Sequence, residues 1–79
     1  MESHHHKIGE EFPEYRDQIH SLKMRDTHFA RVLRNWEELD KRIARAASRI
    51  ELMSEDDEEQ LRRKRLELKD ELYTMLRGI

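Results

Sequence analysis

The sequence predicts an all-α fold, an antiparallel helical hairpin of the coiled-coil type that is preceded by a further helical segment. Charged residues make up 43% of the 79 residues and hydrophobic residues 35%, with two glycines and one proline, which is typical of long helices. Apolar residues recur from Phe29 to Met53 at alternating spacings of three and four, which places them along one side of a helix. A turn signal at Ser54 separates them from a second apolar series.

Length and charge limit the possible functions. A chain of 79 residues is one small domain with a modest core, which favours association with other chains. The net charge of −2 gives no general attraction to nucleic acids or anionic membranes. No apolar run approaches the ~20 residues of a membrane span, and the first residues form no apolar signal segment. Because both are missing, we expect a cytoplasmic protein; the absence of cysteine fits this compartment but also many others.

Residues 1–12 are interpreted as a mobile arm, because they lack apolar periodicity and contain Gly9. His4, His5 and His6 could capture a transition metal loosely, but a closed site needs ligands that are fixed in space. These histidines are either native or a remnant of cloning. We therefore expect no metal site and no cofactor, and we assign residues 13–79 to a single helical domain.

The first helix is predicted over residues 13–25. Pro13 suits the first helical position, where its missing N–H would have no intrahelical partner. Tyr15, Ile19 and Leu22 follow at spacings of four and three and form a short apolar stripe. Asp26 is a good N-cap residue, so that a second helix could begin at the next residue. The apolar series nevertheless stays in phase across this point, so periodicity alone leaves a break and a continuous helix both open.

The second and third helices are predicted over residues 27–51 and 55–77. Ser54 followed by Asp57 resembles a capping box, and the acidic residues 55–59 suit the positive end of the helix dipole. Gly78 fits a C-terminal cap.

A turn near Met53 brings apolar positions of the two long helices opposite each other, for example Leu39 with Leu68 and Trp36 with Leu72. The predicted core of the hairpin consists of Phe29, Val32, Trp36, Leu39, Ile43, Leu61, Leu68, Leu72 and Met75.

The same pairing predicts a conflict in the middle of the hairpin. Asp40 is expected to face Lys69, whereas Arg65 falls at a core-type position beside Ile43. Two explanations are open: the Arg65 side chain extends its charged group past the seam into water, or it finds an acidic partner on another subunit.

A second apolar stripe lies beside the main seam of the third helix, and a two-helix hairpin would leave most of it exposed. Either the first helix folds back onto it or a second copy of the chain packs there. The candidate protein-interaction residues are Tyr15, Ile19, Leu22, Leu66, Tyr73 and Leu76.

Five segments carry a resemblance to a known family: residues 12–19 (FPEYRDQI), 28–29, 39–43, 65–73 (RLELKDELY) and 75–76. With these segments the chain resembles the YdcH-like family, small bacterial cytoplasmic proteins of uncharacterised function. The resemblance covers about residues 12–77 and brings no catalytic residues.

Some relatives in that family have Asn-Pro where this chain has Asp26-Thr27, and proline is disfavoured inside a helix. The resemblance therefore favours a break or kink near residues 25–27. Trp36 departs from the His or Tyr often found at its position, so it carries over no role beyond packing.

We predict a non-enzymatic protein-interaction or oligomerisation module, with a homo-oligomer or a helical protein as the partner and no small-molecule substrate. Enzyme activity is not expected, because a hairpin offers little concavity and His20 and His28 lack a catalytic partner at a useful spacing. The alternative is a nucleic-acid-associated regulator, opposed by the adjacent acidic residues and the negative net charge. Its candidate residues are Lys41, Arg42, Arg45, Arg49, Arg62, Arg63, Lys64 and Arg65.

Overall fold

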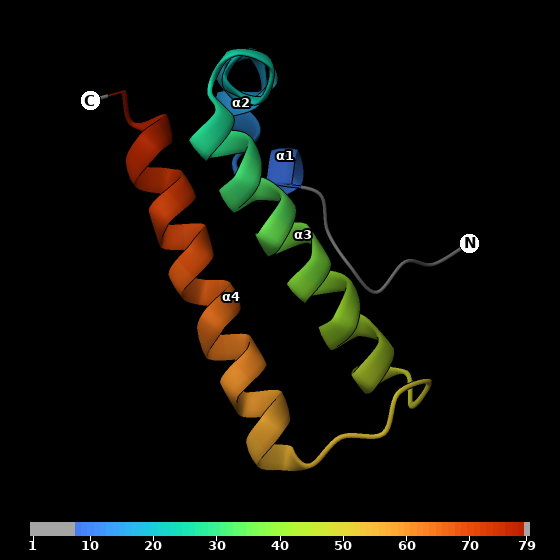
Figure 1. The fold of residues 1–79 in the computed structure, drawn as a ribbon. Coiled ribbons are helices and arrows are strands. Elements are labelled where there is room, and N and C mark those ends of the chain that lie inside the picture. Colours follow the sequence, from blue (N-terminus) through green and yellow to red (C-terminus); the bar gives the residue numbers. More distant parts are fainter. Residues whose placement is uncertain (1–7, 79) are drawn as a thin grey trace.

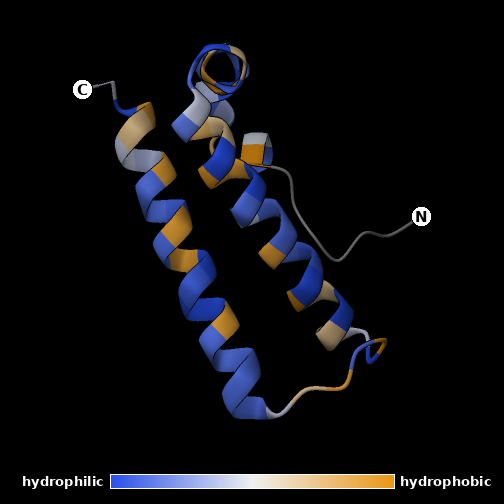
Figure 2. Ribbon diagram, viewed as in Figure 1, coloured by the Kyte–Doolittle hydropathy of each residue, from blue (hydrophilic) through white to orange (hydrophobic). Residues whose placement is uncertain are grey.

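The computed structural model describes residues 8–78 and confirms the predicted all-α hairpin; residues 1–7 and 79 lie outside the described part. Helices α3 (Thr27–Ala47) and α4 (Glu55–Leu76) run antiparallel and are joined by residues 48–54 (Figure 1). A shorter helix, α2 (Arg16–Arg25), crosses the hairpin at the end away from this loop. The apolar residues of α3 and α4 gather on the sides that face each other (Figure 2).

The chain breaks at Asp26, as the family resemblance favours. Its backbone is extended, with φ −122° and ψ 106°, and its carboxylate accepts a hydrogen bond of 3.0 Å from the backbone N–H of Phe29. This side-chain cap starts α3 by satisfying one of its unpaired N–H groups. The break lets α2 fold back, and the Gln18 side chain donates to the backbone carbonyl of Leu76 at the end of α4.

The predicted arm is wrong for residues 8–12. Residues Ile8–Glu11 form a short helix, α1, and a 3-10 helix, η1, follows at Pro13–Tyr15, so that α2 begins three residues later than predicted. Ile8 is buried in the core. A single buried side chain in one helical turn leaves no periodic signal, which explains the error. The histidines His4–His6 lie outside the described residues.

Helix α3 ends at Ala47 and not at residue 51. The N–H of Ile50 donates to the carbonyl of Arg45 at 2.9 Å, and the N–H of Arg49 donates to the carbonyl of Ala46 at 3.2 Å. These bonds form a Schellman motif, in which Arg49 takes the left-handed conformation with φ 64°. Glycine is the usual residue at this position, so the sequence gives no stop signal there.

The limits of α4 agree with the prediction to within one residue at its end. The Ser54 hydroxyl accepts a hydrogen bond of 3.1 Å from the N–H of Asp57, and Gly78 follows the helix with a positive φ of 83°. Both the Ser54 cap and the terminating Gly78 could be recognised from the sequence next to each end of the helix.

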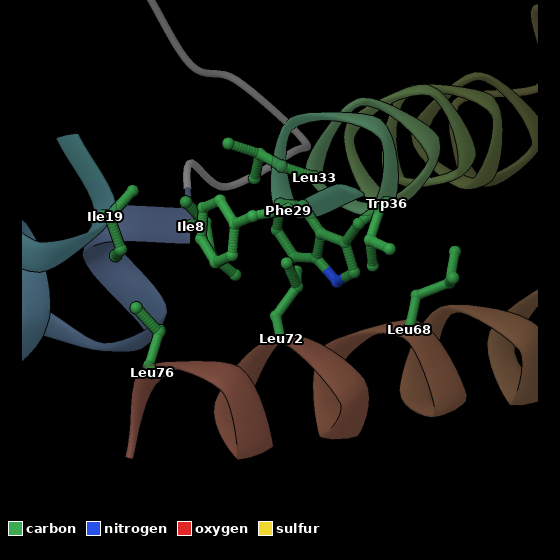
Figure 3. Packing of buried hydrophobic residues seen from close by; sticks show 9 residues of the cluster. Ile8, Ile19, Phe29, Leu33, Trp36, Leu68, Leu72 and Leu76 are labelled. Atoms are coloured by element: carbon green, nitrogen blue, oxygen red, sulfur yellow. The ribbon is translucent and has the colours of Figure 1, made fainter. Parts of the chain in front are cut away.

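The core lies where α1, α2, α3 and α4 meet, away from the loop (Figure 3). Among the predicted core residues, Leu39, Leu61 and Met75 are only partly buried, and the others are buried. The core also contains four residues that were not predicted for it, two from the N-terminal elements that cover the flank of the hairpin and two from α3 and α4. These additional members are Ile8, Ile19, Leu33 and Leu76.

A buried ion pair replaces the predicted conflict in the hairpin. Arg65 Nη1 donates to Asp40 Oδ1 at 2.6 Å, and only 1% of Asp40 is exposed. The acidic partner of Arg65 therefore lies in the same chain, so neither sequence-based explanation is correct. Lys69, the predicted partner of Asp40, instead contacts Glu11 on α1.

Candidate interaction surfaces

The apolar stripe of α2 is used inside the molecule. Ile19 is buried, and Tyr15 and Leu22 are partly buried against the same core. Leu76, a candidate on α4, is fully buried as well. The structure thus assigns these side chains to the fold of a single chain, in line with the first of the two predicted occupants.

An aromatic cluster closes the N-terminal segment (residues 8–15) over α4. The Phe12 ring stacks on Tyr73 with centroids 5.3 Å apart, and Tyr15 meets Tyr73 edge-on at 6.1 Å. Lys69 Nζ lies 5.7 Å from the centroid of Phe12. Leu66, about two turns before Tyr73 on α4, remains more than half exposed.

The predicted nucleic-acid residues are engaged in many ion pairs. Arg42 and Arg45 contact the Glu51 carboxylate at 3.0 and 3.4 Å, and Arg62 and Arg63 each contact an acidic residue one turn earlier on α4. The hydrogen bond from Arg42 is the main cause that lowers the pKa of Glu51 from its ordinary value of 4.5. These contacts offset much of the positive charge of the cluster.

One face of the hairpin carries a groove of about 400 Å³, here called the basic groove. Two leucines on facing helices, Leu39 and Leu68, form its apolar part, and three cationic side chains surround them. Its lining residues are Asn35, Glu38, Leu39, Arg42, Arg45, Lys64 and Leu68. Sequence analysis placed Leu39 and Leu68 in the core and the cations in a separate cluster, and the structure brings the two groups together.

A second groove, also of about 400 Å³, lies beside the buried ion pair. It is lined by Glu11, Trp36, Asp40, Arg62, Arg65, Leu66 and Lys69. The indole N–H of Trp36 is buried without a hydrogen-bond partner, which costs on the order of 1–3 kcal/mol. Figure 3 shows this nitrogen directed toward α4, between Leu68 and Leu72.

The loop end of the hairpin, here called the tip (residues 48–54), exposes apolar side chains. Ile50 is 75% exposed and Leu52 85%. The prediction that α3 continues to residue 51 put Ile50 in the helix, so this surface was missed. Its signal in the sequence was three apolar residues among five directly before Ser54.

The remaining candidates do not gather into a catalytic arrangement. His28 Nε2 lies 3.2 Å from Glu71 Oε2, and both residues are exposed, as is His20. Within residues 8–78, no three metal-ligating side chains are grouped. None of the helices in this part of the chain combines the length and the apolarity that a membrane crossing requires.

The fold and its surfaces define a small helical-hairpin protein. The chain belongs to the family described as "Protein of unknown function (DUF465)", whose family model matches residues 29–76. This agrees with the resemblance to YdcH-like proteins, which are of the same type. The match covers α3, the tip and α4, whereas α1, η1 and α2 precede it. No curated protein and no solved structure gives a significant match.

Proposed function

We propose that the protein is a non-catalytic interaction module that binds an acidic amphipathic helix of a partner protein in the basic groove. The observation that supports this is that Leu39 and Leu68 share one groove with three cations and a single acidic lining residue, Glu38. The three cations also contact Glu51 or Glu67, but their side chains are 48–62% exposed and can meet a partner's carboxylates. A helix that lies in a groove between two others buries its apolar face and meets their charges with its flanks. The proposed partner therefore presents leucine-like residues in a stripe bordered by Glu or Asp.

The shape of the hairpin supports the same proposal. The N-terminal elements cover the hairpin at the end opposite the tip, and the basic groove lies on the remaining length. A third helix there would extend the core of the molecule as in a helical bundle. The exposed His28–Glu71 pair lacks the enclosed surroundings that acid–base catalysis requires, which favours binding over catalysis.

A designed peptide pair tests the charge requirement. One fluorescein-labelled helical peptide carries a leucine stripe flanked by Glu, and its match carries Lys at those positions. Fluorescence anisotropy with the full chain is expected to give a dissociation constant on the order of 10–100 μM for the Glu peptide. The Lys peptide is expected to bind at least tenfold more weakly.

Two adjacent substitutions locate the site. Lys64 lines the basic groove, whereas the exposed side chain of Arg63 does not. Lys64→Glu should weaken binding of the Glu peptide about threefold to tenfold, and Arg63→Glu should leave it within twofold. Equal binding of both peptides, or no binding of either at several hundred micromolar protein, would rule out the proposed site.

A further inference from the structure

The tip holds its apolar side chains outward by an ordered backbone. The N–H groups of Ile50 and Glu51 both donate to the carbonyl of Arg45, at 2.9 and 3.3 Å. The Glu51 carboxylate in turn accepts hydrogen bonds from Arg42 and Arg45. Main-chain and side-chain bonds thus fix the start of the loop in a conformation that leaves Ile50 and Leu52 in water.

This conformation is unfavourable by itself. Arg49 takes a positive φ of 64°, which is costly for a residue with a Cβ atom. Exposure of two large apolar side chains also forgoes the stabilisation that their burial would bring. A contact that buries these side chains would offset both costs.

Opposite charges flank the exposed apolar residues along the chain. Arg49 lies within the tip and Lys41 on α3 about two turns before its end, whereas Glu55, Asp56 and Asp57 lie in the first turn of α4, and all five are exposed. Within residues 8–78, none of these five side chains forms an ion pair. Both charged groups are therefore available to a partner.

We propose that the tip binds the tip of a second copy of the chain about a two-fold axis. Rotation by 180° about an axis that lies in the contact plane, at right angles to the line from the basic to the acidic side, places the basic side of one tip against the acidic side of the other. The surface is then its own electrostatic complement, whereas a partner of uniform charge would be repelled on one side. Ile50 and Leu52 of both copies meet at the centre. The tip shares no residue with the basic groove, so the dimer and the peptide binding proposed above can be tested independently.

Sedimentation velocity of the full chain from about 10 to 500 μM tests the dimer. Such a small contact predicts weak, reversible dimerisation with a dissociation constant on the order of 100 μM. Leu52→Ser should raise this constant at least tenfold without changing the thermal melting curve, because the side chain is already exposed. Met24→Ser, a change at an exposed apolar residue of α2, should leave dimerisation unchanged.

A charge exchange tests the proposed pairing directly. One variant carries Lys41→Glu with Arg49→Glu, and a second carries Glu55→Lys with Asp56→Lys. Each variant alone should remain monomeric by repulsion, and an equimolar mixture should dimerise again; circular dichroism checks that both are folded. A monomeric wild type at 500 μM, a dimer unaffected by Leu52→Ser, or a mixture that stays monomeric would overturn the proposal.

Discussion

Asp40 is the one charged side chain that is buried within residues 8–78, and Arg65 reaches it across the hairpin. The Arg65 side chain is 32% exposed, whereas the Asp40 side chain that it contacts is only 2% exposed. The pair fixes the position of α4 along α3, because a shift by one turn would separate the two groups.

Removal of one member of this pair is expected to destabilise the fold more than removal of both. Arg65→Ala leaves the Asp40 carboxylate buried without its arginine and should lower the free energy of unfolding by about 3 kcal/mol. The double variant Asp40→Leu, Arg65→Met should recover most of this loss, since apolar pairs often replace buried ion pairs without cost. Urea denaturation followed by Trp36 fluorescence measures both; additive losses would contradict a coupled pair.

At this scale the sequence predicted which side of each helix is buried and the pairs of Arg62 and Arg63 within α4, but not which charges meet across the hairpin. The heptad spacing correctly identified Phe29, Trp36 and Leu72 as core residues. The pairing of Asp40 with Lys69 was wrong by one helical turn, because residues 65 and 69 lie on the same face of α4. Periodicity defines a face, whereas the register along it depends on the packing of all elements.

Among the helix ends, those set by neighbouring residues were predicted from the sequence, whereas the end of α3 was not. Asp26 and Ser54 were predictable caps, because Asp and Ser are residue types that favour this position. In the structure, each side chain accepts a hydrogen bond from the backbone N–H three residues later. The end of α3 at Ala47 was not predictable, because the apolar series continues through Ile50 and Arg49 occupies the position that glycine usually takes. The tip was missed for this reason.

Arg49→Gly is expected to stabilise the protein, which is the reverse of the usual effect of glycine. It relieves the positive φ of 64°, and the free energy of unfolding should rise by about 1 kcal/mol in thermal or urea denaturation of dilute protein. Arg49→Ala keeps the Cβ atom and should bring no such gain. If α3 instead continued through this position, Arg49→Gly would destabilise it by about 1 kcal/mol.

For the whole molecule, the returning N-terminal segment turns a two-helix hairpin into a domain with a common core. Ile8 lies in this core and Phe12 packs against it, both from outside any periodic pattern, so periodicity did not reveal them. The family match begins only at residue 29, within α3.

Loss of the Ile8 side chain should weaken the entire domain. Ile8→Ala is expected to lower the free energy of unfolding by about 2–3 kcal/mol, because it leaves a cavity in the shared core. Met24→Ala removes a side chain that is largely exposed and should change the free energy of unfolding by less than about 0.5 kcal/mol. Helical circular dichroism and Trp36 emission should shift together in Ile8→Ala; equal effects of the two variants would show that residue 8 lies outside the core.

The packing of the N-terminal segment against α4 has a consequence for the order in which the chain folds during synthesis. Glu11 contacts Lys69, which is 58 residues later in the chain. At ~5–20 residues per second, about 3–12 s separate the synthesis of these two residues on the ribosome. Ile8 and Phe12 are synthesised before α4, against which they pack. During this interval α2 and α3 can already become helical. The first described residues to be synthesised are thus among the last to reach their native contacts.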